Sequence, residues 1–405
     1  MGIILPLLIK YKEKIMPHIK IKPLDKNSLD NIVEKSSIIK FRADAENGGD
    51  YLFGVELNGE SFLLQLKRDR DMDMFKYDKV TRPLKVNLIK EALRLLSSDL
   101  AFETIQNNIN QSKSEPPLSS EYFKKIKDFE DISFSSDEVS IEVGFGSGRH
   151  LLYQAEKNPN ILFIGLEIHT PSAQQVLKQI ELKGLTNIWV VNYDARLFLE
   201  MMPSNLCSKI FVHFPVPWDK KPHRRVISSS FIDEALRVLR VNGSLELRTD
   251  SDKYFWYSLE TFFNLPKAEV TIDKNRELEI TSKYEARWKK QEKDIYEVHL
   301  KAKENSEEKV LDISFNFNEI GYNRDIKEKL PKKAVIEDGY FIHFERVYSI
   351  GDDALLIKCA FGSFDRPEHK YILVGKDLCQ YYASTPVKTE VNFKAHKKIM
   401  EFLNV

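Results

Sequence analysis

The sequence is poor in cysteine and carries no net charge. Its 405 residues include three cysteines, Cys207, Cys359 and Cys379, which are spaced too widely for a zinc knuckle or a disulfide framework. We therefore expect reduced thiols, a cytoplasmic location and no metal site. Lys and Arg together number 61, as do Asp and Glu, so the chain as a whole does not attract nucleic acid. A nucleic-acid partner would require a local basic patch.

A long hydrophobic run is absent from the start of the chain. Residues 1–9 are mostly apolar, but Pro6 interrupts them and they are too few to span a bilayer. They also lack the basic segment and the small-residue cleavage site of a secretory signal. We expect a soluble protein without a membrane partner, whose translation starts at either Met1 or Met16.

The length of the chain predicts more than one hydrophobic core. A stretch rich in Ser, Asn and Gln with Pro116-Pro117 is typical of a linker, and the charged run 301–309 indicates a second boundary. We therefore predict an N-terminal α+β accessory region at 1–110, a central domain at 121–303 and a strand-rich C-terminal accessory region at 310–405. The sequence leaves open what the flanking regions do and whether the protein is a monomer or a homodimer.

The two flanking regions carry local structural signals. Asn58-Gly59 separates two apolar runs at 51–57 and 61–66, and this dipeptide favours a two-residue hairpin turn. Residues 86–96 show apolar side chains at helical spacing. In the C-terminal region we predict strands at Val310–Phe317, Gly339–Tyr348, Ala354–Phe361 and Lys370–Gly375, and a helix at Lys394–Leu403.

In the central region, short apolar runs alternate with amphipathic segments. This alternation predicts a doubly wound, mostly parallel α/β sheet with helices on both faces. Such sheets bind ligands beyond the carboxyl ends of their strands. The strands are predicted at 139–143, 161–167, 188–192, 210–214 and 244–249, and the helices at 171–183, 195–202, 228–240 and 253–263.

A glycine-rich turn, Gly144-Phe145-Gly146-Ser147-Gly148, follows the first of these strands. Glycines let the backbone approach a ligand closely, and the start of the next helix offers free N–H groups. The spacing differs from the dinucleotide fingerprint because Arg149 stands where that fingerprint has its last glycine. Alone, the turn is weak evidence, since a tight turn needs glycine for its conformation.

An acid ends each of three successive strands, and this series strengthens the case for a cofactor. Any one of Glu142, Glu167 and Asp194 is more often a helix cap or a solvated charge. Together beside the turn, they predict that Glu167 binds a ribose diol and Asp194 an adenine amine. A carboxylate at Glu142 suits the positive charge of S-adenosylmethionine and would repel a pyrophosphate. We therefore predict an S-adenosylmethionine site that also includes the backbone of Gly144 and Gly146.

A proline-rich, basic loop follows the fourth strand. Pro215 and Pro217 restrict the backbone and hold Trp218, which either stacks on a base or anchors the loop. Basic side chains at the end of a strand beside the cofactor favour phosphate contact. The basic residues are Lys220, Lys221, His223, Arg224 and Arg225, of which we predict Lys221, Arg224 and Arg225 to contact RNA phosphates; a second cluster comprises Lys283, Arg287, Lys289 and Lys290.

These motifs, in this order, resemble the bacterial tRNA (guanine-N7-)-methyltransferases, in a long form with extra N- and C-terminal regions. Residues 142–148 are similar to the family's EIGFGxG, 165–169 to its GIExH, 193–195 to its xDA and 214–225 to its FPDPWxKxxHxxRR; 249–250 match its TD and 282–285 its [T]x[YF]E. The resemblance covers about 137–300. It implies a class I S-adenosylmethionine methyltransferase fold and methyl transfer to N7 of a guanosine in the tRNA variable loop. It also implies substrate contacts by Lys220, Asp250, Ser282, Lys283, Tyr284 and Glu285.

One position departs from the family pattern. Val216 stands where the family has an aspartate that is usually assigned to the active site. Guanine N7 carries a lone pair and no proton, so the transfer needs no general base, and alignment can supply most of the rate. The catalytic residue stays open, with Asp219 and Asp250 as candidates for the role of the missing acid. Two alternatives also stay open: a Rossmann-like methyltransferase acting on a small molecule or protein, and a non-catalytic RNA-binding relative.

Overall fold

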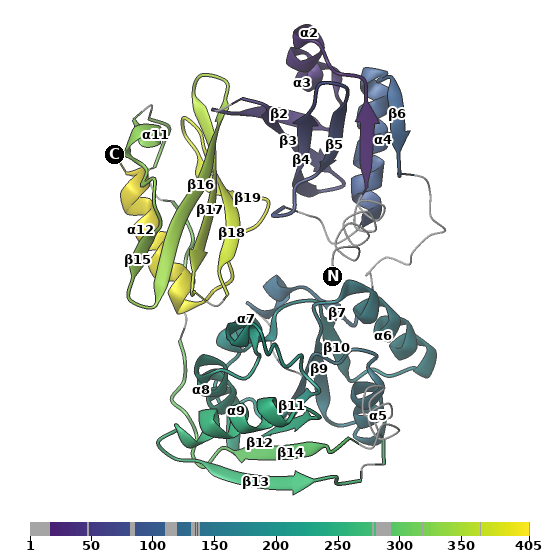
Figure 1. Ribbon diagram of the computed structural model, residues 1–405, viewed down its shortest axis with the longest axis vertical. Helices are drawn as coiled ribbons and strands as arrows, with labels where there is room; N and C mark the ends of the chain where they lie inside the picture. The colour runs from purple at the N-terminus through teal and green to yellow at the C-terminus, as the bar shows by residue number, and fades with distance from the viewer. Residues whose placement is uncertain are drawn as a thin grey trace. The chain divides into compact units, whose positions relative to one another are not determined.

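The computed structural model shows two compact units, each with its own sheet (Figure 1). The first unit comprises residues 1–115, 313–386 and 390–405, and the second comprises 116–312 and 387–389. The structure describes residues 17–46, 48–81, 86–109, 120–130, 134, 136, 138–277, 279–280, 293–310, 312–317, 320–323, 325–364 and 366–404.

The two flanking regions, which the sequence separates, share one sheet in the first unit. Over the described residues its strand order is β19-β18-β17-β16-β2-β3-β4-β5-β1-β6, with β15 paired to β16. The halves join where β2 pairs with β16, through Ala45 opposite Tyr348. The N-terminal half comprises β1 (His18–Ile21), β2 (Ile39–Ala45), β3 (Asp50–Leu57), β4 (Glu60–Arg68), β5 (Asp73–Tyr77), β6 (Thr104–Asn107), α2 (Lys26–Asp30), α3 (Ile32–Lys35) and α4 (Val86–Leu100). The C-terminal half comprises β15 (Val335–Glu337), β16 (Tyr340–Ile350), β17 (Ala354–Gly362), β18 (Glu368–Val374), β19 (Cys379–Tyr382), α11 (Ile326–Lys329) and α12 (Glu390–Leu403).

The hairpin predicted around Asn58-Gly59 is confirmed. Strands β3 and β4 are antiparallel, with Leu57 opposite Glu60. Asn58 and Gly59 have φ angles of 52° and 76°, the left-handed conformation that a two-residue hairpin turn of this type requires. The helical spacing of residues 86–96 is confirmed as well, since Ile89, Leu93 and other apolar residues of α4 are buried.

The predicted strand at Val310–Phe317 is wrong, because the described residues of that range form no strand. The alternation that suggested it has another cause. Ile313, Phe315 and Phe317 are buried, and the rings of Phe315 and Phe317 lie 5.4 and 4.6 Å from that of His396 in α12. The segment therefore packs by its side chains without joining a ladder of backbone hydrogen bonds.

The second unit confirms the predicted doubly wound, mostly parallel α/β sheet. Its strand order is β13-β14-β12-β11-β8-β9-β10-β7 over the described residues, and the strands from β12 to β7 run parallel. The antiparallel pairs β12–β14 and β13–β14 form the other edge. The strands are β7 (Phe123–Lys124), β8 (Val139–Val143), β9 (Leu162–Leu166), β10 (Ile188–Val191), β11 (Cys207–His213), β12 (Leu239–Thr249), β13 (Glu269–Lys274) and β14 (Tyr296–Lys301).

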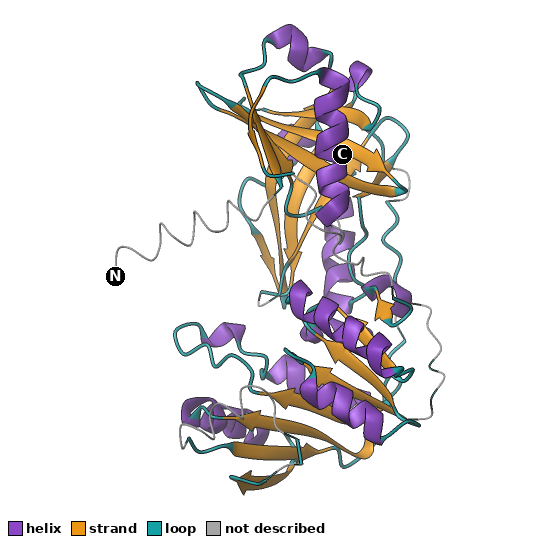
Figure 2. Cartoon of the chain, turned by 90° about the vertical axis from the view of Figure 1, so that its right-hand side faces the viewer, coloured by secondary structure: helices purple, strands orange, loops and turns teal. Residues whose placement is uncertain are grey.

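Helices cover both faces of this sheet, and Figure 2 shows them packed along its strands. On one face, Leu151 of α5 (Arg149–Lys157) and Val176 of α6 (Thr170–Lys183) share a core with strand residues such as Phe163. The core of the other face includes buried residues of α7 (Ala195–Met201), α8 (Ser229–Val238) and α9 (Asp252–Phe263). None of the described helices is long and apolar enough to span a membrane.

The strand order places a topological switch point at the centre of the sheet. From β8 the chain proceeds to β9 and β10 on one side, and then crosses to β11 and β12 on the other. The strands β8 and β11 are neighbours, and the loops that follow them lead to opposite sides of the sheet. Open α/β sheets bind their ligands in the crevice at this point.

Candidate active site

The glycine turn after β8 has room for a ligand on one side and a close helix on the other. Gly144, Gly146 and Gly148 have φ angles of 71°, 53° and 70°, a region that favours glycine. A Cβ atom added at Gly144 or Gly146 would meet nothing within 4 Å. A Cβ at Gly148 would lie 2.3 Å from Cγ2 of Val176 in α6. The first two glycines thus face open space, whereas Gly148 permits close packing of α6.

Glu167, just after β9, ties the glycine turn to the next strand. The Gly146 N–H donates to its Oε2 and the His169 N–H to its Oε1, each at 2.9 Å. The backbone of Glu167 is held in turn, since Asn192 Nδ2 donates to its carbonyl at 2.6 Å. Each carboxylate oxygen keeps a second acceptor position. Glu167 is therefore placed to bind two further hydroxyl donors, as the sequence predicts for a ribose diol.

Glu142 is buried beside the glycine turn and contacts a histidine of the next helix. Its side chain is only 3% exposed, and its Oε2 lies 2.8 Å from Nδ1 of His150 in the first turn of α5. The predicted contact of this carboxylate with the cofactor stays a prediction, and the structure adds a second role. Glu142 orients α5 from beneath the glycine turn, because strand alternation turns it toward the face that α5 covers.

Asp194 caps a helix, one of the interpretations that the sequence leaves open. As N-cap of α7, it accepts a hydrogen bond from the Arg196 N–H at 2.9 Å and pairs with Arg196 Nη2 at 2.7 Å. A third of its side chain is exposed, so the carboxylate can still accept a donor from a ligand. Its position follows the carboxyl end of β10, on the same edge as Glu167.

The loop after β11 is held in an unusual conformation. Phe214 and Trp218 have φ angles of 51° and 45°, a region that bulky side chains rarely adopt. The Phe214 N–H donates to the carbonyl of Arg248 in β12 at 2.7 Å. Val216 lies between these two residues with 60% of its side chain exposed. Strained backbone of this kind gathers at ligand-binding sites, where the surrounding structure has to maintain it.

Arg225 is a structural residue of this loop, which corrects the predicted phosphate contact. It is buried, its Nε donates to the carbonyl of Pro217 at 2.8 Å, and its guanidinium lies 4.3 Å from the ring centre of Tyr257. It also pairs with Asp219 at 3.7 Å. The guanidinium is thus committed to holding the loop and is not available to a solvent-exposed phosphate.

The other basic residues of the loop face solvent. Lys220, Lys221 and Arg224 are exposed, and the Arg224 guanidinium lies 5.2 Å from the ring centre of Trp218. This contact gives Trp218 an anchoring role and leaves three cations beside the carboxyl end of β11. They agree in position with the predicted RNA-contacting surface.

Of the two acids that could replace the missing aspartate, Asp250 is better placed. It follows the carboxyl end of β12, next to β11, and its Oδ2 lies 2.9 Å from Nζ of Lys293. Asp219 is half-exposed and paired with Arg225. The predicted substrate residues Ser282, Lys283, Tyr284 and Glu285 lie outside the described residues, as does the second basic cluster.

A set of buried charges beneath the site was not anticipated from the sequence. Arg248 of β12 and Glu297 of β14 face each other and form an ion pair, both almost fully buried. Glu246 Oε1 accepts a hydrogen bond from the Nε2–H of His213 at 2.9 Å, and the His213 ring lies 4.5 Å from that of His150. The only sequence pattern that could have indicated these buried charges is the alternation of polar and apolar residues along β12 and β14. Such alternation is more typical of a strand with one face exposed to solvent.

This charge set does not favour a metal ion. Ligand atoms of Glu246, Glu297 and His299 lie within 4.8 Å of one another. However, Glu297 already pairs with both Arg248 and Arg276. Two guanidinium groups beside the same carboxylate neutralise it and repel a cation. The acids are better explained as members of an ionic network.

The Glu142–His150 pair gives stability that depends on pH. Burial lowers the pKa of His150, but the charge and hydrogen bond of Glu142 outweigh it and raise the pKa above its ordinary value of 6.5. A raised folded-state pKa stabilises the fold fully below pH 6.5, and this contribution is lost as the pH rises through the folded-state value. We expect Glu142→Gln to reduce the free energy of unfolding more at pH 6 than at pH 8.5, as measured by urea denaturation. An equal reduction at both pH values would contradict this coupling.

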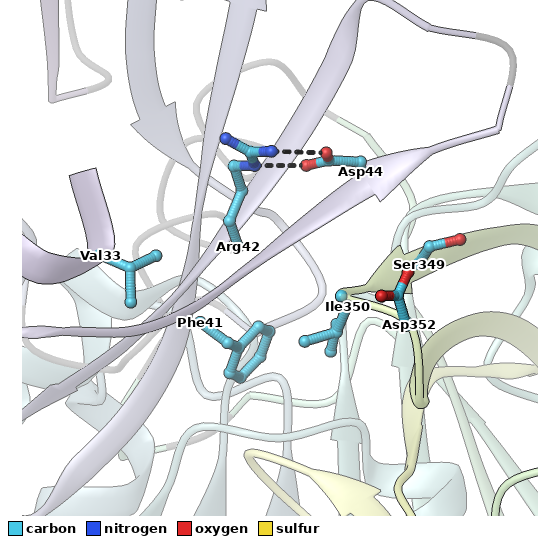
Figure 3. A pocket seen from close by; sticks show the side chains of 8 residues that line it. Val33, Phe41, Arg42, Asp44, Ser349, Ile350 and Asp352 are labelled. Atoms are coloured by element: carbon cyan, nitrogen blue, oxygen red, sulfur yellow. Dashed lines mark hydrogen bonds and ion pairs between the residues drawn. The ribbon is translucent and has the colours of Figure 1, made fainter. Parts of the chain in front are cut away.

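A separate hollow of about 350 Å³ lies in the first unit (Figure 3). It is lined by residues of α3 and β2, by the end of β16 and by the turn after it. Its only arginine, Arg42, donates from Nε and Nη2 to the two carboxylate oxygens of Asp44, at 2.7 and 2.9 Å. That guanidinium also pairs with Asp30. The hollow therefore offers no free cation to an anionic ligand.

The chain is similar to known methyltransferases along most of its length. The family described as "Putative methyltransferase" matches residues 136–298. Three proteins named "tRNA (guanine-N(7)-)-methyltransferase" are 40% identical (Wolinella succinogenes; 87% of this chain, 91% of that protein), 38% identical (Campylobacter jejuni; 96% and 99%) and 42% identical (Helicobacter acinonychis; 84% and 85%). These relatives thus match the flanking segments as well as the second unit. A solved "SAM dependent methyltransferase" from Aquifex aeolicus covers 44% of this chain and 87% of that one, at 15% identity and a TM-score of 0.30, values too low to bear on the assignment.

Proposed function

The chain belongs to the tRNA (guanine-N7)-methyltransferase family, and from this premise we propose that it transfers a methyl group from S-adenosylmethionine to N7 of a guanosine in the tRNA variable loop. The observation that carries the proposal is the glycine turn held by Glu167 at the switch point, directly beside the strained loop after β11. A cofactor site and a cationic substrate loop thus leave neighbouring strands. Such a reaction takes place where tRNA is found, in the cytoplasm.

The residues of the turn fit the cofactor. The open space beside Gly144 and Gly146 admits a ligand against the backbone, Glu167 can accept from ribose hydroxyls, and Asp194 can accept from an adenine amine. Glu142 keeps α5 in place through His150. S-adenosylmethionine, when bound, supplies an electrophilic methyl group on a sulfonium centre. These residues therefore orient the donor and exclude water, and none of them has to exchange a proton.

The substrate side of the site also needs no general base. Guanine N7 attacks through its lone pair. The protein therefore has only to align the base with the methyl group of the donor and to accept hydrogen bonds from the N–H groups of the guanine. Val216 provides no acceptor at the position where the family has an acid. Asp250, at the carboxyl end of the next strand, takes that role in our proposal. The exposed cations Lys220, Lys221 and Arg224 contact the backbone of the RNA. Because N7 is inaccessible in regular A-form helix, the target nucleotide is splayed out of a loop.

The activity is tested directly by mass spectrometry. Unmodified tRNA is incubated with the protein and isotope-labelled S-adenosylmethionine, digested and analysed for methylated nucleosides. We expect labelled 7-methylguanosine in fragments from the variable loop. A protein that binds both ligands and labels no tRNA would be a non-catalytic RNA-binding relative, and labelling of a small molecule or protein instead would also overturn the proposal.

Asp250→Asn tests the assignment of the substituted acid. A hydrogen bond that involves a charged group contributes about 1.5–3 kcal/mol, so we expect the methyl-transfer rate constant at saturating substrates to fall roughly 10- to 100-fold. Affinity for S-adenosylmethionine should stay unchanged. The matched control is Asp252→Asn, which alters an exposed acid two residues later, at the start of α9. Wild-type rates in Asp250→Asn and in Asp219→Asn would refute the idea that a nearby acid replaces the one missing at Val216.

A further inference from the structure

Over β1, β4 and β5, one face of the first unit's sheet carries basic side chains and is not covered by helix α4. Helix α4 packs against β1, β3 and β5 (Figure 1). On that face, alternate strand residues such as Ile19, Leu66 and Phe75 are fully buried. The residues between them point to the opposite face, where Leu52 and Leu63 belong to a second core but the residues toward β1 and β5 are half-buried or exposed. They include His18, Lys20, Gln65, Lys67, Met74 and Lys76.

Cross-strand pairing gathers the lysines of this face. Lys20 and Lys67 both lie opposite Met74, one on each side of it. They are thus separated by two strand spacings, about 9.5 Å. Lys76 lies two residues beyond Met74 on β5, directly opposite His18. The three lysines therefore form a compact triangle over β1, β4 and β5, hereafter the lysine face.

The lysine face has acids nearby, since Asp50 lies directly opposite Lys67 and the charges of Asp78 and Asp50 act on Lys76, but its lysines form no ion pair with them among the described residues. None of Lys20, Lys67 and Lys76 forms an ion pair with an acid among the described residues of the chain. Asp50, at the end of the row that contains Lys67, is paired with Arg346. Burial, together with the charges of Lys67 and Lys79, lowers the pKa of Lys76. Lys20 and Lys67 are diagonal cross-strand neighbours of Lys76, within reach of long side chains, so an anionic partner that binds here relieves the repulsion among the three charges.

We propose that the lysine face binds the phosphate backbone of RNA. The identity of that RNA as tRNA rests on the proposed function. Lysines spread over a flat sheet match a chain of phosphates, whereas a protein partner would need an apolar centre that only Met74 supplies here. Among its described residues the face carries no Phe, Tyr or Trp ring for base stacking. It therefore contributes affinity and not sequence recognition.

The test compares two triple variants of the full-length protein. In the first, Lys20, Lys67 and Lys76 are all replaced by Gln, which keeps the side chains polar and removes their charges. The control replaces Lys332, Lys333 and Lys376, which are exposed lysines elsewhere in the same unit. Dissociation constants for tRNA are measured from about 50 to 300 mM salt. Three lost phosphate contacts should weaken binding roughly 10- to 100-fold and reduce the slope of log K against log salt by about 2–3.

Two further measurements separate this inference from the proposed function. Replacing the same three lysines by Arg should restore both affinity and salt slope, which a folding defect would not allow. The methyl-transfer rate constant at saturating tRNA should not change in either variant. If the wild-type protein binds tRNA without methylating it, the proposed function fails while the lysine face is still tested by the salt slope. If the Gln variant binds tRNA with the affinity and the salt slope of its control, the inference is overturned. Binding to polyglutamate, an acidic polypeptide, is measured in parallel. A Gln variant that loses only the binding to polyglutamate would assign the face to a protein partner and also overturn the inference.

Discussion

Glu167→Ala should weaken S-adenosylmethionine binding by roughly 30- to 1000-fold, because hydrogen bonds to a charged group worth about 2–4 kcal/mol in total are lost. The carboxylate acts in two ways at once. It accepts hydrogen bonds from the N–H groups of Gly146 and His169, which fixes the turn, and we propose that its remaining acceptor positions bind the ribose hydroxyls. Removing it therefore frees the backbone and deletes the ligand contact.

A second variant separates these two contributions. Glu167→Gln retains one acceptor for a backbone N–H but has no charge and only one oxygen, so we expect a loss of roughly 10-fold, from about 1.5 kcal/mol. Glu181→Ala, an exposed change on α6, is the control and should bind normally. Calorimetry of cofactor binding without tRNA measures all three. If Glu167→Ala binds within a factor of three of the wild type, Glu167 is not a cofactor residue.

Local patterns in the sequence predicted the second unit well, and the reason is geometric. Parallel strands buried on both faces give continuous apolar runs, and β8 begins and ends where the sequence places it. The other predicted central elements agree to within a few residues, apart from β11 and β12, which begin several residues earlier, but β7 and the antiparallel strands β13 and β14 were not predicted. The first unit was harder to predict, because the pairing of β2 with β16 joins segments about three hundred residues apart and no local pattern records it.

The candidate site was predictable in its position but only partly in its contacts. The series of acids at strand ends predicted a site at the carboxyl edge of the sheet, where Glu167 and Asp194 lie. It could not show that Glu142 turns toward His150, because that depends on which face of β8 the helix α5 covers. Likewise, a run of basic residues does not distinguish exposed Lys221 from buried Arg225. That distinction arises when Tyr257 and the carbonyl of Pro217 enclose the guanidinium.

The buried pair of Arg248 and Glu297 carries the second large expected effect. Arg248→Met removes the only buried cation beside the Glu297 carboxylate among the described residues, so we expect the free energy of unfolding at pH 7 to fall by about 3–5 kcal/mol. Arg276 and His299 also contact Glu297, but they compensate poorly. Arg276 is exposed, and burial lowers the pKa of His299, which favours its neutral form. Lys274→Met, which breaks the exposed pair with Asp294, should cost less than about 1 kcal/mol and is the control.

The double variant Arg248→Met/Glu297→Met should recover most of this stability, since two well-packed apolar side chains replace a costly buried pair. A double variant as unstable as the single one would mean that the loss comes from packing and not from an unpaired charge. We nevertheless expect the double variant to transfer methyl groups more slowly. The carbonyl of Arg248 in β12 accepts a hydrogen bond from the N–H of Phe214, where the strained loop begins. A shift of β12 along its neighbouring strand would therefore change the conformation of that loop. The ionic pair aligns β14 with β12 at this point, and apolar side chains do so with less directional preference. Restored stability together with reduced transfer would therefore assign the buried pair to the alignment of the site.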